Sequence, residues 1–315
     1  MIAFGPVPSR RLGRSLGINN IPPKVCTYSC VYCQVGRTLK MQVERRKFYD
    51  PVGILKEVRV KVERSKEAGE TIDYLTFVPD GEPTLDAHLG LEMELLKPLE
   101  IPIAVMTNTS LIERGDVREE LMKADWVSLK LDAVREEVWH RINRAHRGLH
   151  LSSIQDAMLE FAKAYNGELA TETMLVKGIN DNDELVGEVA DFLARLRPAH
   201  ACLSIPTRPP AGKWVRPASE ESINRAYQVL SSRVDHVEYL IGYEGNAFAF
   251  TGNVEEDLLS ITPVHPMREE AVREFLAREK ADWPVVQRLI AQGRLIETEY
   301  EGGKFYMRKL RWKNA

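Results

Sequence analysis

Short apolar runs alternate with amphipathic segments along most of the chain, and this alternation is the feature that most restricts its fold. The apolar runs are continuous, which is typical of strands that are covered on both faces. The segments between them have the spacing of amphipathic helices. Because strands separated by helices usually become parallel neighbours, the sequence predicts a parallel sheet covered by helices.

The predicted strands are short, and they span residues 15–18, 72–78, 102–108, 126–132, 169–176, 201–207 and, as a last strand, 237–243. The predicted helices between them span residues 51–68, 87–96, 114–123, 152–164, 183–196 and 220–232. We expect loops in most of the first fifty residues. The pattern gives about six βα units, whereas a complete TIM barrel has eight. We therefore predict an α/β fold, a partial (β/α)6 TIM-like barrel, with its chemistry at the C-terminal strand ends.

The pattern changes in the last quarter of the chain. It predicts two helices and then two strands, over residues 267–279, 283–292, 294–300 and 304–309. Asp282 is placed to cap the second helix and Gly293 to end it. The pair Gly302-Gly303 suits a tight turn between the strands. We therefore predict two domains. Residues 1–254 form the partial barrel, with a loop near its N-terminus that carries three clustered cysteines and is called the cluster loop below. Residues 255–315 form a small winged-helix-like domain.

Composition excludes several classes of protein. The chain has 315 residues, of which 44% are hydrophobic, and a formal net charge of −3. No strong global field therefore attracts it to nucleic acid or to a membrane. No apolar run approaches the roughly 20 residues that span a bilayer, and the N-terminus lacks an apolar signal segment. We expect a cytoplasmic protein with no membrane partner, in a compartment where thiols stay reduced.

Three of the four cysteines lie within eight residues, as Cys26, Cys30 and Cys33 with the spacing Cys-x3-Cys-x2-Cys. Three thiolates on one loop can ligate three irons of a [4Fe–4S] cluster and leave the fourth iron open to a cofactor. The alternative is a zinc knuckle, but structural zinc takes four ligands. Cys202 could be the fourth, yet its apolar sequence surroundings favour a buried small hydrophobic residue.

The cysteine segment resembles the radical S-adenosylmethionine (SAM) superfamily, which has an aromatic residue before the third cysteine, here Tyr32. The resemblance implies a reduced cluster that cleaves SAM to methionine and a 5′-deoxyadenosyl radical, which abstracts a hydrogen atom from a substrate. It also implies an electron donor such as flavodoxin or ferredoxin. Tyr32 is then expected near the adenine of the cofactor. The catalytic residues stay unassigned.

The sequence Gly81-Glu82-Pro83 follows the predicted strand 72–78 and looks like the amine-binding element of the superfamily. A carboxylate can accept a hydrogen bond from the ammonium group of the cofactor, and a glycine allows close backbone approach. The superfamily often has a second glycine in front, and Asp80 stands in that place. Taken alone, the segment would be an ordinary turn with an exposed glutamate.

Polar side chains on later strands are candidates for further cofactor contacts. Asn108 ends one strand and could bind the ribose or the methionine carboxylate, or could instead cap the next helix. Ser128, Lys130 and Asp132 alternate along the next strand and point to one face. Such a polar stripe is unfavourable unless it lines a cavity. We therefore expect Lys130 near the cofactor carboxylate and Asp132 near the ribose or the substrate.

Alternation along the next predicted strand, residues 169–176, does not show which of its two faces points inward. Either Glu172 points inward, or Thr171 and Thr173 do. Two charged loops are predicted at the same edge of the sheet. Their side chains either belong to the functional site or only face solvent. They include Asn143, Arg144, His146, Arg147 and Arg208. A basic N-terminal segment could bind phosphate, carboxylate or nucleic acid, or could pair with acidic neighbours; it contains Arg10, Arg11 and Arg14.

The segment FGPVPSRRLGRSLGIN, the cysteine trio and GEPTL resemble a narrower group, the wyosine-synthase-related iron–sulfur oxidoreductases. The resemblance covers about residues 1–250. True wyosine synthases act on a guanine beside a tRNA anticodon and carry a second cluster on three more cysteines. Only Cys202 is left for such a cluster here, so we expect this chain to lack it.

The end of the tail is basic, with Lys304, Arg308, Lys309, Arg311 and Lys313. This fits a phosphate contact, and together with the family resemblance it favours a radical enzyme that modifies RNA such as tRNA. The whole segment 255–315 has no net charge, however. The alternative is a radical SAM enzyme that acts on a protein or small metabolite, with the tail as a docking module. A more distant alternative is a cluster- or zinc-bearing regulator that binds nucleic acid.

Overall fold

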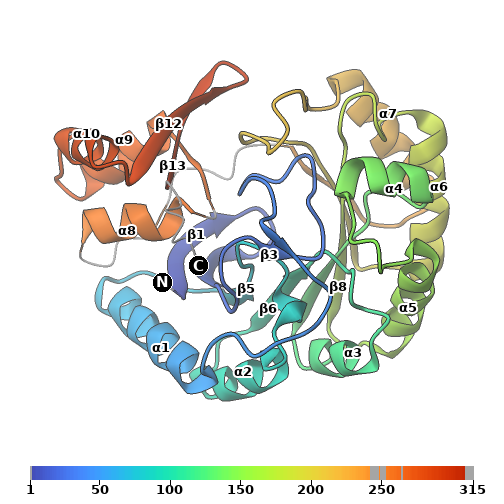
Figure 1. Ribbon diagram of the computed structural model, residues 1–315, viewed down its shortest axis with the longest axis horizontal. Coiled ribbons are helices and arrows are strands. Elements are labelled where there is room, and N and C mark those ends of the chain that lie inside the picture. Colours follow the sequence, from blue (N-terminus) through green and yellow to red (C-terminus); the bar gives the residue numbers. More distant parts are fainter. Residues whose placement is uncertain (1, 242–247, 249–252, 264, 309–315) are drawn as a thin grey trace.

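The computed structural model describes residues 2–241, 248, 253–263 and 265–308. Its centre is one eight-stranded curled sheet with the order β1-β2-β5-β6-β7-β8-β9-β10 (Figure 1). From β2 to β10 all neighbours are parallel, and β1 alone is antiparallel to its neighbour. The strands are β1 Ala3–Ser9, β2 Gly13–Ile18, β5 Tyr74–Phe77, β6 Ile103–Thr107, β7 Trp126–Lys130, β8 Glu168–Met174, β9 His200–Ser204 and β10 Val237–Leu240.

Helices cover the outer, convex face of this sheet (Figure 1). They are α1 Pro51–Glu67, α2 Leu89–Leu96, α3 Gly115–Leu121, α4 Glu136–Asn143, α5 Leu151–Ala164, α6 Asp183–Leu196 and α7 Glu220–Ser231. Within this sheet, each of the parallel strands β2, β5, β6, β7, β8 and β9 is connected to the next by a segment that contains a helix, and β10 is the last strand of the series. The prediction of an α/β partial barrel is therefore confirmed. Its core forms where the apolar helix faces meet the sheet, around side chains such as Leu75, Val105 and Phe161.

Several elements escaped the sequence analysis, among them β1 and α4. Strand β1 contains Pro6 and Pro8, which argue against a strand, but an edge strand tolerates proline because one side of it donates no ladder hydrogen bonds. Helix α4 was expected to be loop, and Asn143 is its last residue rather than part of the loop that follows. The predicted strand 126–132 ends at Lys130, so Asp132 lies just beyond it. The Tyr243 end of the predicted strand 237–243 lies outside the described residues.

The cluster loop leaves β2 and returns to α1 across the C-terminal edge of the sheet. It contains a short parallel pair, β3 Val25–Cys26 and β4 Lys40–Met41. Two 3-10 turns, η1 Pro83–Leu85 and η2 Lys97–Leu99, flank α2. The first of these turns follows β5 directly and brings residues 80–84 against the cluster loop, where the amide of Glu82 donates to the carbonyl of Val25.

The tail holds three helices and a small antiparallel sheet with the order β11-β13-β12. Its elements are α8 Val254–Ile261, β11 Met267–Arg268, α9 Glu269–Arg278, α10 Pro284–Ala291, β12 Leu295–Tyr300 and β13 Gly303–Arg308. Asp282 does not cap α10, because Trp283 occupies the N-cap position and no side chain bonds there. The hairpin turn is Glu301-Gly302 rather than Gly302-Gly303; both turn residues have positive φ, as a tight β-hairpin turn requires.

The tail packs on the open edge of the barrel. Phe4 and Val7 of β1 belong to the same apolar cluster as Phe275 and Leu289 of the tail. An ion pair of 3.0 Å between Lys61 of α1 and the fully buried Asp257 of α8 adds a second link. Among the described helices, none combines the length and apolarity needed to cross a membrane.

Candidate functional site

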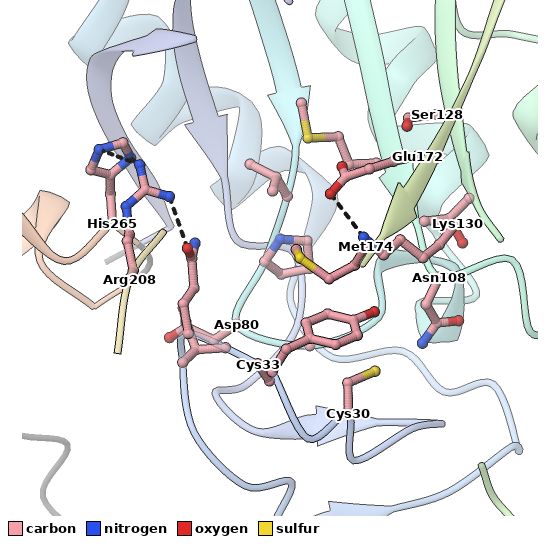
Figure 2. Close-up of a pocket in the computed structure, with 18 of the residues that line it drawn as sticks. Cys30, Cys33, Asp80, Asn108, Ser128, Lys130, Glu172, Met174, Arg208 and His265 are labelled. Carbon is pink, nitrogen blue, oxygen red and sulfur yellow. Dashed lines mark hydrogen bonds and ion pairs between the residues drawn. The ribbon is translucent and has the colours of Figure 1, made fainter. Parts of the chain in front are cut away.

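A cavity of about 370 Å³ opens at the C-terminal ends of the barrel strands and is lined by the three clustered cysteines, of which Figure 2 labels Cys30 and Cys33. Its walls come from the cluster loop, from the ends of β5 to β8, from the loop after β9 and from the tail. Of the predicted site residues, those that line it are Cys26, Cys30, Cys33, Tyr32, Gly81, Asn108 and Lys130. Glu82, Pro83 and Asp132 are buried nearby but do not line it.

Backbone hydrogen bonds fix the cluster loop against the segment around the end of α4. The amide of Ser29 donates to the carbonyl of Asn143 at 3.0 Å, and that of Val31 donates to Ile142 at 2.9 Å. The amide of His146 returns a bond to the carbonyl of Thr27. The loop INRAHRG therefore serves the site as a backbone support, whereas the side chains of Arg144, His146 and Arg147 do not line the cavity.

The three cysteines carry the donor set that a [4Fe–4S] cluster with one open iron requires, one thiolate for each of three irons. Among the described residues, no three His, Cys, Asp or Glu side chains gather closely enough to hold a single metal ion. Burial raises the pKa of the Cys30 thiol to about 12, and the carboxylate of Asp132 adds to this effect. Bound cations reverse this preference for the protonated thiol. The trio therefore fits a [4Fe–4S] cluster.

Amide side chains reach the sulfur atoms of the two cysteines that precede Tyr32. The Nδ2 of Asn108 lies 3.4 Å from the Sγ of Cys26 and donates to the Oγ1 of Thr27 at 2.8 Å. The Nδ2 of Asn143 lies 3.5 Å from the Sγ of Cys30. Such bonds orient metal ligands and stabilise their charged form. The predicted helix cap is not the main role of Asn108, although its Oδ1 also accepts from the amide of Ser110.

Tyr32 is held in place at both ends of its side chain. Its hydroxyl donates to the carboxylate of Asp132, which also accepts from Asn143 at 2.7 Å. The amine of Lys130 lies 5.0 Å from the centre of its ring, within cation–π range. The second oxygen of Asp132 accepts from the amide of Met174. Asp132 therefore positions Tyr32 and the end of β8, and its carboxylate is fully engaged in doing so.

Gly81 lies where no side chain fits, because a Cβ atom there would collide with the carbonyl oxygen of Val25. The carboxylate of Glu82 is saturated within the protein. One oxygen accepts from Thr84 and from the hydroxyl of Thr107, and the other accepts from the amide of Asn108 at 2.7 Å. These bonds stabilise the turn that presents Gly81 and the end of β6. At this turn the backbone faces the cavity, and the glutamate acts as its support.

A partly buried charge network forms the floor of the cavity (Figure 2). Glu172 accepts from Lys130 at 2.8 Å, from Arg11 at 2.6 Å and from the hydroxyl of Ser204 at 2.8 Å. Lys130 and Glu172 are register partners on β7 and β8. Burial opposes the ionisation of Glu172, but the two cations outweigh it and hold its pKa well below the ordinary value. Ser128 also lines this floor.

These contacts decide the question that periodicity left open. Glu172 faces the cavity, whereas Thr171 and Thr173 face away, and the hydroxyl of Thr173 donates to the carbonyl of Leu131. Of the N-terminal arginines, Arg10 and Arg11 line the cavity. Arg14 instead pairs with Glu70 at the surface. Cys202 is buried in β9 and does not line the cavity, as expected for a small hydrophobic residue.

The cavity has a second polar end, which sequence analysis found only in part. Arg208, from the loop after β9, donates to the Oε1 of Gln34 at 2.8 Å and to the ring of His265 at 2.9 Å (Figure 2). Burial, together with the charges of Arg208 and Arg10, holds the pKa of His265 well below its ordinary value. His265 comes from the tail. No local pattern in the sequence connects it with the barrel, so only the folded chain reveals it.

Lys24 and Asp80 also line the cavity beside Cys33, and both are almost fully buried. In the sequence, Asp80 stands in place of the usual glycine, whereas no local pattern points to Lys24. Burial raises the pKa of Asp80 to about 6, and the charge of Lys24 opposes that rise. Burial likewise raises the pKa of the Cys33 thiol, which Lys24 opposes.

Comparisons with known proteins show the family and the fold of this chain. A family model described as the radical SAM superfamily matches residues 20–193. A UPF0026 protein of Methanocaldococcus jannaschii is 47% identical over 312 residues, which cover 98% of this chain and 97% of that protein. The structure of TYW1 with a lysine–pyruvate adduct bound has a TM-score of 0.53 at 17% identity, covering 70% of this chain and 74% of that one.

A radical SAM methyltransferase from Sphaerobacter thermophilus has a similar likeness, with a TM-score of 0.53 at 20% identity. The match covers 73% of this chain and 66% of that one. At these identities the two solved structures show a shared fold.

Proposed function

This chain belongs to the radical SAM superfamily and to the UPF0026 family, and on that premise we propose that Cys26, Cys30 and Cys33 ligate one [4Fe–4S] cluster whose open iron binds SAM. The observation that carries this proposal is that all three cysteines face one cavity together with Tyr32 and Lys130. The cavity lies at the C-terminal edge of a partial barrel, where enzymes of this architecture carry their chemistry.

When bound, the cluster and SAM supply an electron, methionine and a 5′-deoxyadenosyl radical that removes a hydrogen atom from a substrate. The residues of the chain hold and shield these groups. Asn108 and Asn143 orient the thiolates of Cys26 and Cys30 through their amide groups. The backbone at Gly81 offers polar groups to the methionine amine.

The other residues that line the cavity have separate roles in this proposal. Tyr32 offers an aromatic face to the adenine and keeps its orientation through Asp132. Lys130 offers an ammonium group to a carboxylate or a ribose hydroxyl, and Glu172 keeps that group charged and in place. The packed apolar strands behind these residues exclude water from the site.

We test this proposal with anaerobically reconstituted protein that is reduced by dithionite. Chromatography measures 5′-deoxyadenosine formed from SAM. The expected result is product from the unaltered chain and none from Cys30→Ala, because a cluster that lacks a ligand is not held. Cys202→Ala is the matched control, and it should keep most of the activity because Cys202 lies outside the cavity.

Two outcomes would overturn the assignment. Normal product formation by Cys30→Ala would remove that cysteine from the ligand set. Binding of zinc in place of iron, without product, would favour the zinc-bearing regulator instead.

Radical SAM enzymes generally need a reductant, and we propose that a flavodoxin or a ferredoxin supplies the electron here. The cluster loop supports this choice because it lies at the mouth of the barrel, where β4 is exposed at Lys40 and Met41. A protein donor can therefore approach the cysteines from the side opposite to the strands.

For the tail we propose a winged-helix-like domain that forms part of the site wall and docks a protein or small-molecule substrate. Three observations support this role. His265 lines the cavity. The hydroxyl of Tyr300, at the tip of the hairpin, donates to the carbonyl of Pro206 at 3.0 Å. Lys304 pairs with Glu297 inside the hairpin.

Contact with RNA stays a prediction. Lys309, Arg311 and Lys313 lie outside the described residues, and Arg308 donates to the carbonyl of Leu259. An RNA-free cell extract separates the two possibilities. If it still stimulates turnover of SAM by the enzyme, the substrate is a protein or a small molecule. If stimulation requires intact RNA, the docking proposal fails.

A further inference from the structure

Lys24 is the most unusual charged residue of the cavity. Only 5% of it is exposed, and its Nζ has no hydrogen-bond partner and no ion pair among the described residues. An ammonium group buried without a partner is strongly unfavourable. A group of this kind that lines a cavity therefore points to a ligand of opposite charge.

The backbone is arranged to direct this side chain inward. Lys24 has a φ of 66°, a left-handed conformation that is uncommon for a residue other than glycine. Its amide donates to the carbonyl of Asp80 at 2.9 Å, and its carbonyl accepts from Leu39 and Lys40. Strain of this kind persists only where neighbouring bonds enforce it, and it is concentrated at functional sites.

The amine lies over the turn that carries the third cysteine. A side chain on Gly36 would begin 3.4 Å from the Nζ of Lys24, and the amide of Gly36 donates to the carbonyl of Cys33 at 3.0 Å. Lys24 also stands two residues before Cys26 in the chain, and it lines the cavity together with Cys26 and Cys33. The ammonium group is therefore adjacent to two of the three proposed cluster ligands.

Asp80 has the opposite charge in the same place. It is 2% exposed, and its Oδ1 has no partner among the residues that the structure describes. Although Lys24 and Asp80 both line the cavity, they form no ion pair with each other within 4.0 Å in the described part of the chain. The two charges therefore attract each other without a close ion pair, and both remain in the part of the cavity that Cys33 lines.

We propose that Lys24 and Asp80 are positioning residues that set the reduction potential of the cluster from opposite directions. This inference rests on the proposed function, because it requires a cluster on Cys26, Cys30 and Cys33. Reduction adds one electron to the cluster, and the donor loses that electron; no atom is transferred. A fixed positive charge beside Cys33 favours the more negative, reduced state, and a fixed negative charge disfavours it. Cluster potentials respond in this way to nearby charge and to hydrogen bonds at sulfur.

The test is a redox titration of the reconstituted cluster, followed by electron paramagnetic resonance, in the absence of SAM and of any substrate. We expect a lower midpoint potential in Lys24→Met and a higher one in Asp80→Asn. Lys24→Arg keeps the charge and should stay close to the unaltered protein. Lys40→Met is the matched control: it removes a lysine from the same loop, but this lysine is exposed to solvent, and water screens its charge.

The outcomes separate this inference from the proposed function. Failure of the unaltered chain to assemble a [4Fe–4S] cluster would refute the proposed function itself. A cluster whose potential in Lys24→Met equals that in Lys40→Met would overturn the role of Lys24. Weaker SAM binding by Lys24→Met at an unchanged potential would do the same, and would assign the amine to the cofactor carboxylate. If Lys24→Met assembles no cluster, the opposite shift in Asp80→Asn and the absence of a shift in Lys24→Arg still decide the question.

Discussion

Two buried carboxyl groups behind the Gly81 turn face each other, and they show how single residues in this fold respond to pH. Asp86 and Glu92 are 0% and 1% exposed, and each has one oxygen without a partner of its own. The Nδ2 of Asn20 donates to the other oxygen of Glu92 at 3.2 Å. Burial, followed by the charge of Asp86, raises the pKa of Glu92 above its ordinary value. One proton is therefore shared between the two groups.

This arrangement predicts that the protein loses stability as the pH rises from about 4.5 toward the raised pKa of Glu92. Because the pKa of Glu92 is raised on folding, the folded chain binds more protons than the unfolded chain at pH values above about 4.5. Its free energy of unfolding therefore falls as pH rises from there toward the folded pKa. Glu92→Gln keeps a hydrogen bond with Asp86 without that proton. We expect its stability, measured by urea unfolding, to fall less between pH 6 and pH 9 than that of the unaltered chain.

Glu119→Gln is the control for this experiment, since Glu119 is an exposed carboxyl group on α3. Parallel pH profiles for Glu92→Gln and the unaltered chain would show that the buried pair does not titrate as expected.

At the scale of elements, the site depends on two turns that approach each other very closely. The turn after β5 lies against β3 at Gly81, and the carbonyl of Val25 occupies the space that a side chain would need. We expect Gly81→Ala to push β3 away from the turn, since the colliding atom belongs to the backbone and cannot rotate aside. The variant should bind less iron on reconstitution, and its thermal midpoint should fall by several degrees, as expected for a loss of about 1–3 kcal/mol by overpacking.

Gly115→Ala provides the control for the turn. Gly115 begins α3 and has no atom within 4 Å of the position of a Cβ. It should retain the iron content and the midpoint of the unaltered chain, or gain slightly in stability. Full iron binding by Gly81→Ala would mean that the cluster loop adapts easily.

At the scale of the whole molecule, the first strand joins the barrel to the tail. The ring of Phe4 covers Gly17 of β2, where any side chain would collide with it, and the same ring belongs to the apolar cluster of the tail. We predict that Phe4→Ala lowers the free energy of unfolding by about 3–5 kcal/mol. Because the lost contacts lie between the two parts, it should also expose the tail to limited proteolysis before the barrel.

Val60→Ala tests whether this effect is specific. Val60 is 38% exposed on α1 and does not belong to the apolar cluster of the tail, so its truncation should change stability by no more than about 0.5 kcal/mol. Equal rates of proteolysis in Phe4→Ala and Val60→Ala would show that β1 does not hold the tail.

The sequence by itself determined the class of fold and the loop that carries the three clustered cysteines. Both follow from local order: continuous apolar runs specify buried strands, and the spacing of Cys26, Cys30 and Cys33 brings three thiols onto one short loop. It could not identify β1, because Pro6 and Pro8 are unfavourable in strands except at an edge, and edge position is a property of the sheet. It also missed α4, whose end supports the cluster loop.

Only the tertiary structure decided which polar residues meet. Periodicity placed Thr171, Glu172 and Thr173 on alternating faces but could not orient the strand, whereas packing turned Glu172 toward Lys130. The saturated bonds of Glu82 and the convergence of Lys24 with Asp80 likewise depend on segments distant in sequence. The local sequence pattern indicates which side of each segment is buried. Which charged residues contact each other depends on the tertiary fold, because the partners lie on segments that are distant in the sequence.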